Sequence, residues 1–293
     1  MTAPFRPALV EGLQPLANRY DLVLCDIWGV LHNGVKAYEA AGEALTRFRG
    51  GGGHVVLVSN APRPGASVAT QLDGFGIPRS AYDAIVTSGD LTRLAIEERL
   101  RQVVHHIGPQ RDLPMFADLG IRFGTIEEAD YVVCTGLEND ERETAADYLL
   151  RLEAMLRRNL LMICANPDLL VERGHMIIPC AGAIGLAYEE LGGPVYYAGK
   201  PHVPIYERAV AKAAALAGHE IAKSRVLAIG DAIRTDIAGA VAFGIDSLLI
   251  ARGIHAEELN LHQGALVSQH VQDWVDRQAA RPQAITTTLS WAA

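Results

Sequence analysis

The stretch Leu22-Val23-Leu24-Cys25-Asp26-Ile27-Trp28-Gly29-Val30-Leu31 contains an apolar run that ends at a carboxylate. Two other runs end in a similar way, because residues 54–58 stop at Ser59-Asn60 and residues 226–230 stop at Asp231. Short apolar runs bounded by polar or glycine residues are typical of buried parallel strands. Ligands of open α/β sheets bind beyond the carboxyl ends of such strands. We therefore expect these polar residues to form an active site at one edge of a sheet.

Segments with helical spacing of apolar residues alternate with these strands. The pattern predicts helices over Tyr38–Arg49 and Arg63–Phe75 near one end of the chain, and over Ile205–Ala217 and Thr235–Phe243 near the other. Four consecutive glycines, residues 50–53, end the first of these helices. Alternating strands and helices predict an α/β fold with a parallel sheet and right-handed crossovers.

The middle of the chain predicts a second α/β unit. Apolar runs at 131–134 and 161–164 are joined by a predicted helix over Asp147–Arg158, and a short strand at 176–179 is followed by a helix over Ile184–Leu191. We expect residues 88–193 to be an inserted domain, and residues 1–87 and 194–293 to form the host core. A domain joined to its host by two crossings can act as a hinged lid. After Gly253 the pattern is less regular, with one predicted helix over His270–Arg277.

Composition limits the class of protein. A chain of 293 residues, 49% hydrophobic and 20% charged, is long enough for about two domains with a sizeable core. The net charge of −8 and the absence of a basic stripe argue against nucleic acid as a partner. No apolar stretch approaches a membrane span or a secretory signal, and the four cysteines lack Cys-x-x-Cys spacing. We therefore expect a soluble cytoplasmic protein without a membrane partner.

Asp26 is the candidate nucleophile. A carboxylate at a strand end can attack phosphorus and form an acyl phosphate, which water then hydrolyses. That reaction needs a hard cation such as Mg²⁺ to screen the two anions, and Asp231 offers a second carboxylate ligand. Asp236 opens the following predicted helix and could orient the metal shell. Taken singly, a strand-end Asp is as readily a helix cap or a turn residue.

Two further segments suit a phosphoryl group. The Ser59 hydroxyl and the nearby backbone N–H groups could hold phosphoryl oxygens, although Ser59-Asn60 could also cap the following helix. Lys200, in Gly199-Lys200-Pro201-His202, could neutralise both Asp26 and a phosphate, although most lysines are simply solvated.

The order of these segments resembles the four motifs of the haloacid dehalogenase (HAD) superfamily. The motifs are Asp26-x-x-Gly29-Val30-Leu31, Ser59-Asn60, Gly199-Lys200-Pro201 and Gly230-Asp231-x-x-x-Thr235-Asp236. The long gap between the second and third motifs is similar to the class II branch with a large α/β cap, the p-nitrophenyl phosphatase and sugar-phosphatase-like group. Asn166-Pro167-Asp168 resembles a motif of those caps. The resemblance covers residues 20–255.

The resemblance implies a Rossmann-like core and Mg²⁺-dependent hydrolysis of a small phosphorylated metabolite. Asp26 would be nucleophile and metal ligand, with the backbone carbonyl of Trp28 and the Asp231 carboxylate as further ligands and Asp236 in support. Ser59, Asn60 and Lys200 would hold the phosphoryl group. The cap would recognise the leaving group through Asp168 and a turn at residues 181–183. Apolar cap surface is also compatible with a homodimer.

The chain departs from the family at Trp28, where family phosphatases usually carry a second Asp that protonates the leaving alcohol. An indole cannot exchange a proton at useful pH. One interpretation keeps a phosphatase and moves proton transfer to His32 or His202, either of which could also be an ordinary loop histidine. A second is a dehalogenase-type hydrolase, since a halide leaves without a proton. A third is a phosphate-binding protein that has lost turnover.

Overall fold

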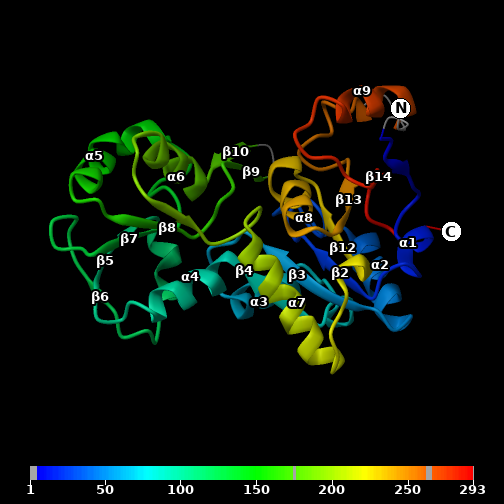
Figure 1. The fold of residues 1–293 in the computed structure, drawn as a ribbon, viewed down its shortest axis with the longest axis horizontal. Helices are drawn as coiled ribbons and strands as arrows, with labels where there is room; N and C mark the ends of the chain where they lie inside the picture. The colour runs from blue at the N-terminus through cyan, green and yellow to red at the C-terminus, as the bar shows by residue number, and fades with distance from the viewer. Residues whose placement is uncertain (1–4, 174–175, 262–265, 293) are drawn as a thin grey trace. The chain divides into compact units, whose positions relative to one another are not determined.

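We describe the chain from a computed structural model, which places residues 5–173, 176–261 and 266–292 (Figure 1). These residues fall into two compact units. The first unit combines segments 1–59, 69–85 and 206–293, and the second combines segments 60–68 and 86–205. Each unit is an α/β structure, and each is described by itself below.

The first unit is built on a parallel sheet. Among the described residues, its strands run in the order β1-β14-β13-β12-β2-β3-β4. The bounds are Ala8–Leu9 (β1), Leu22–Cys25 (β2), His54–Ser59 (β3), Ala84–Thr87 (β4), Val226–Gly230 (β12), Asp246–Ile250 (β13) and Ala284–Thr286 (β14). Strand β2 pairs in parallel with β12 on one side and β3 on the other. The central strands β2 and β12 are buried along their whole length, as their apolar sequences require.

Helices and short helical turns connect these strands. They are α1 (Gln14–Ala17), α2 (Glu39–Gly50), α3 (Gly65–Gly74), η1 (Arg79–Ala81), α7 (Val203–Ala217), η4 (Lys223–Arg225), η5 (Ile233–Ile237), α8 (Ala238–Phe243) and α9 (Ser268–Val275). The structure therefore confirms the predicted α/β fold with a parallel sheet.

The second unit has its own parallel sheet. Its described strands run in the order β11-β8-β7-β5-β6, and a separate antiparallel pair joins β9 to β10. The bounds are Val103–Ile107 (β5), Arg122–Phe123 (β6), Tyr131–Cys134 (β7), Leu161–Cys164 (β8), Leu170–Arg173 (β9), Met176–Pro179 (β10) and Val195–Tyr197 (β11). The helical segments are α4 (Ser88–Glu97), η2 (Gln110–Phe116), η3 (Ala145–Tyr148), α5 (Leu149–Arg157) and α6 (Ala181–Glu190).

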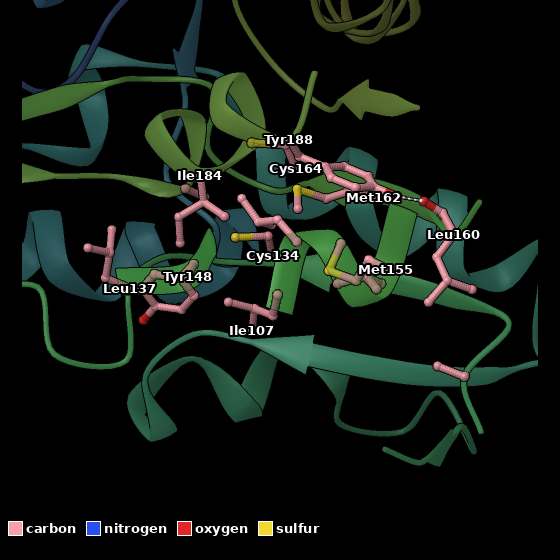
Figure 2. Close-up of a cluster of buried hydrophobic side chains, with 14 residues drawn as sticks. Ile107, Cys134, Leu137, Tyr148, Met155, Leu160, Met162, Cys164, Ile184 and Tyr188 are labelled. Atoms are coloured by element: carbon pink, nitrogen blue, oxygen red, sulfur yellow. Dashed lines mark hydrogen bonds between the residues drawn. The ribbon is translucent and has the colours of Figure 1, made fainter. Parts of the chain in front are cut away.

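Side chains of this second sheet are buried on both faces. Val132 and Met162 point into a cluster with residues of α5 and α6, and Figure 2 shows Met162 there beside Tyr188. Val133 and Ile163, one position further along the same strands, belong to a second cluster on the other face. Alternate burial of this kind is what the period of a strand produces when both faces are covered. The Tyr188 hydroxyl donates to the Leu160 carbonyl 2.8 Å away, so its polar end is satisfied inside the core.

Two segments differ from their predictions. The predicted helix over Thr235–Phe243 begins earlier, as a π-helical turn at Ile233–Ile237 followed by α8. Residues 181–183, expected to form a turn, are instead the first turn of α6. A Cβ at Gly182 would lie 2.3 Å from the Pro167 carbonyl oxygen, so this glycine lets the helix pack directly against the loop after β8.

Candidate functional site

Three carboxylates of the first unit converge at the carboxyl edge of its sheet. Asp26 follows β2, Asp231 follows β12, and Asp236 lies in η5. One oxygen of each lies within 4.8 Å of the others, and the three residues are 8%, 9% and 3% exposed. Buried carboxylates this close repel one another unless a cation or a proton is shared between them. The arrangement is therefore a candidate site for a divalent metal ion, whose preferred ligands are oxygens.

Strand pairing explains why residues so distant in sequence meet. Cys25 of β2 is in register with Ile229 of β12, and the Asp26 amide donates to the Ile229 carbonyl at 2.8 Å. The residues that leave these two parallel strands therefore emerge side by side. Strand β3 pairs with the other side of β2 and ends at Ser59, which is 7% exposed at the same edge. Parallel pairing alone thus delivers two carboxylates and a hydroxyl to one place.

Glycines make room for the carboxylates. A Cβ at Gly29 would lie 2.1 Å from Asp231 Oδ2, and one at Gly253 would lie 2.0 Å from the same oxygen. Gly29 also has a φ of +80°, which L side chains rarely adopt. The Ile254 amide then donates to Asp231 Oδ2 at 3.1 Å, and the Ala232 amide to Asp236 Oδ2 at 3.2 Å. Gly253 could not be predicted from the sequence, because no local pattern marks a glycine that makes room for a carboxylate beside another strand.

Trp28 and His32 lie together after β2. Their rings are 5.0 Å apart and edge to face, and His32 stacks on Phe75 at 4.5 Å. The His32 side chain is almost entirely buried, and the Gly34 amide donates to its Nδ1 at 2.9 Å. A neutral His32 therefore carries its proton on Nε2. To act as an acid near neutral pH, the ring must also take up a proton on Nδ1, in place of the hydrogen bond from Gly34.

The predicted phosphate-binding residues of the second unit form one network. The Asn60 amide oxygen accepts from the Lys200 amide at 2.8 Å and from Ser88 Oγ at 3.3 Å. Its amide nitrogen donates to the Lys200 carbonyl at 3.0 Å and to Asp168 Oδ1 at 2.9 Å. These four contacts use the whole hydrogen-bonding capacity of an Asn side chain. The Asn60 side chain thus clamps the Lys200 backbone.

Lys200 itself is only 3% exposed. It is followed by Pro201 and then by His202. The His202 ring stacks in parallel on Tyr197 with centroids 5.0 Å apart. Burial lowers the pKa of His202, so it is neutral at physiological pH and has reduced capacity as an acid there. A Cβ at Gly199 would lie 2.0 Å from Ser88 Oγ, so the close approach of these segments requires glycine.

Comparisons with known proteins identify the family. A family model described as haloacid dehalogenase-like hydrolase matches residues 23–122, and a HAD-hydrolase-like model matches residues 197–289. The chain is 44% identical to a solved haloacid dehalogenase-like hydrolase from Brucella suis 1330, with a TM-score of 0.84 and coverage of 96% of this chain and 100% of that one. The chain therefore belongs to the haloacid dehalogenase-like hydrolases, and it is an enzyme of that family.

Other relatives carry more specific names. A 5'-nucleotidase from Bacillus subtilis (strain 168) is 26% identical over 241 residues, which is 82% of this chain and 90% of the relative. A glycerol phosphate phosphatase from Mycobacterium tuberculosis, solved in complex with magnesium, shares the fold with a TM-score of 0.68 and 23% identity. That comparison covers 95% of this chain and 78% of the other.

Two further features concern membrane-spanning helices and the cysteines. Within the residues that the structure places, we find no helix with the length and apolar character needed to cross a bilayer. All four cysteines are buried as free thiols, as expected from their spacing.

Proposed function

We propose that the protein is a Mg²⁺-dependent phosphatase that hydrolyses a small phosphorylated metabolite, such as a sugar phosphate, through an aspartyl-phosphate intermediate. The observation that carries the proposal is the convergence of Asp26, Asp231 and Asp236 within 4.8 Å at the carboxyl edge of a parallel sheet. Family membership supports it, as do the names of two relatives, a 5'-nucleotidase and a glycerol phosphate phosphatase.

The donor set fits magnesium. Carboxylate oxygens from Asp26 and Asp231, with the backbone carbonyl of Trp28, would hold the ion, and Asp236 would support that shell. Bound there, Mg²⁺ would screen the charge between the nucleophile and the phosphoryl group. The related glycerol phosphate phosphatase was solved with this ion.

Each residue of the site has its own role in the proposed reaction. An Asp26 carboxylate oxygen attacks phosphorus, a P–O bond forms on Asp26, and the bond to the leaving alcohol breaks. Water subsequently attacks the acyl phosphate and releases inorganic phosphate. We assign Ser59 Oγ and the Asn60 backbone N–H to the phosphoryl oxygens, and the Lys200 ammonium to their negative charge.

The leaving oxygen needs a proton, which Trp28 cannot supply. We propose His32 as the general acid, supported by its place beside Trp28. For this role the ring must be the imidazolium: Nδ1 takes up a proton in place of the hydrogen bond from the Gly34 amide, and Nε2 then gives its proton to the leaving oxygen. Aryl phosphates have acidic leaving groups and depend less on this proton than alkyl phosphates do. A dehalogenase would not need the metal that Asp231 and Asp236 would hold, since a halide leaves without a metal and without a proton.

We further propose that residues 88–193 are an inserted cap domain and that residues 1–87 and 194–293 are the catalytic core. The compact unit over 86–205 supports an insertion of about this extent. Asp168 in this cap would recognise the leaving group. Exposed Met176 and Ile177 on β10 support a homodimer, and the buried free cysteines support a reducing compartment such as the cytoplasm.

The test is hydrolysis of p-nitrophenyl phosphate and of a metabolite panel, with Mg²⁺ and with a chelator. Asp26→Asn keeps the size of the side chain but removes the nucleophilic carboxylate, and should abolish turnover. Asp73→Asn is the matched control, because Asp73 forms a half-exposed surface ion pair with Arg79. Undiminished turnover in Asp26→Asn, or equal turnover with the chelator, would overturn the proposal. Mg²⁺-independent chloride release from a 2-haloacid would select the dehalogenase.

A further inference from the structure

The segment after β13 carries a chain of side-chain hydrogen bonds that leads back to the acidic cluster. Trp274 of α9 donates through Nε1–H to Glu258 Oε2 at 2.6 Å. The same carboxylate lies 3.3 Å from His255 Nδ1. On the other side of the ring, the Ile233 amide donates to His255 Nε2 at 3.2 Å. This segment lies largely beyond the family motifs, yet it contacts the loop that joins two of the candidate metal ligands.

The directions of these bonds fix the state of the histidine. Because the Ile233 N–H donates, Nε2 of His255 must accept, and the ring proton is on Nδ1, facing Glu258. The Trp274 ring closes the other side of the imidazole, with centroids 5.1 Å apart and an angle of 61°. His255 is therefore held from two sides by groups of the tail segment.

The loop is fixed by packing and by backbone contacts as well. Ile233 and Ile237 of η5 lie in one buried cluster with Trp274. The Ile254 amide, beside His255 in sequence, donates to Asp231 Oδ2. Ile233 thus lies between Asp231 and Asp236 in the sequence, and His255 accepts the hydrogen bond of its amide. An amide that lost this part-buried acceptor would favour a different conformation of residues 231–236.

We propose that His255 is a positioning residue for the metal site: with Glu258 and Trp274 behind it, it holds the loop 231–236 so that Asp231 and Asp236 face the cation. The inference rests on the proposed metal-dependent function of that site. His255 does not touch the ion in this assignment. Residues just outside a ligand shell commonly act in this way, by orienting the ligands before the ion binds.

The test measures binding of Mn²⁺ alone to metal-free protein by titration calorimetry. His255→Leu removes the acceptor for the Ile233 amide, and we expect Mn²⁺ affinity to fall about 10-fold. His255→Gln places an amide oxygen near the Nε2 position, and it should bind Mn²⁺ within about 2-fold of the unchanged protein. Rescue by Gln distinguishes positioning of the loop from general packing.

A matched pair of variants tests the outer part of the chain of bonds. Glu258→Ala should weaken Mn²⁺ binding, whereas Glu257→Ala, an equally charged and exposed neighbour, should not. Trp274→Phe keeps an aromatic ring and removes the N–H that donates to Glu258. If His255→Leu fails to fold, this variant tests the chain of hydrogen bonds in its place. The KM for p-nitrophenyl phosphate at saturating Mg²⁺ should stay unchanged in the folded variants.

The outcomes separate the two proposals. If the unchanged protein binds Mn²⁺ and every variant binds it equally well, the inference about His255 is wrong and the metal site stands. If His255→Gln loses as much affinity as His255→Leu, the accepted hydrogen bond is not the cause. If the unchanged protein binds no Mn²⁺, the proposed metal site fails, and the role of His255 fails with it.

Discussion

Gly29→Ala should disable the metal site through a single methyl group. Gly29 has a φ of +80°, and its added Cβ would lie 2.1 Å from Asp231 Oδ2, where real contacts essentially never come within 3.0 Å. The φ strain alone costs about 1–2 kcal/mol of folding free energy. The overlap forces the Asp231 carboxylate away by about 1 Å, a misplacement that can lower catalytic efficiency roughly 100-fold.

Gly76→Ala is the control for this prediction. Gly76 has nearly the same φ, +77°, but an added Cβ meets nothing within 4 Å. Both variants should therefore lose a similar free energy of unfolding from φ strain, measured by urea denaturation. Only Gly29→Ala should also lose Mn²⁺ affinity, by about 10–100-fold in titration calorimetry. Equal Mn²⁺ affinity in the two variants would refute the role that we give to the contact between Gly29 and Asp231.

Trp28→Asp supplies a carboxyl group two residues after Asp26 and should raise phosphate release from an alkyl phosphate by roughly 10²–10⁴-fold; an unchanged rate would mean that proton transfer at this position is not limiting. His32→Ala should remove one limb of the pH profile of kcat/KM, and an unaltered profile would exclude His32 as the general acid. Burial lowers the pKa of His106 from 6.5 to about 4, so the unfolded chain binds more protons in that range and stability falls as pH drops through it. His106→Gln should therefore reduce the loss of stability between pH 7 and pH 5 by about 2 kcal/mol in urea unfolding, and parallel curves for both proteins would contradict this.

Sequence patterns were most informative where a strand is uniformly apolar. The runs that became β2, β3 and β12 are continuous and end at polar residues, so their strand character and their common edge could be predicted. Strand β5 was missed because His105 and His106 interrupt its apolar run. The structure accommodates both rings: His105 Nδ1 lies 2.9 Å from the Gly124 carbonyl oxygen, and His106 Nε2 lies 2.9 Å from Thr135 Oγ1.

Within the candidate site, too, some features could be predicted from the sequence and others could not. The acidic residues could be placed at a sheet edge from their strands, but the contacts that hold them depend on pairing between distant segments. Nothing local marks the Ile233 amide as a donor to His255, or Asn60 as a clamp on the Lys200 backbone. The π-helical turn that carries Asp236 was likewise predicted as ordinary helix, because its sequence has helical spacing and the widened turn depends on contacts with other segments.

The strand order of the first sheet has a consequence for biosynthesis. Strand β1, near the beginning of the chain, pairs with β14, near its end, and β2 has no β12 beside it until residue 226 has been made. The second unit, by contrast, is complete once residue 205 has left the ribosome. At translation rates of about 5–20 residues per second, the remaining 88 residues take several seconds more. During that interval β2 still lacks β12 and β1 still lacks β14, and a nascent chain at this stage is the species on which a chaperone would act.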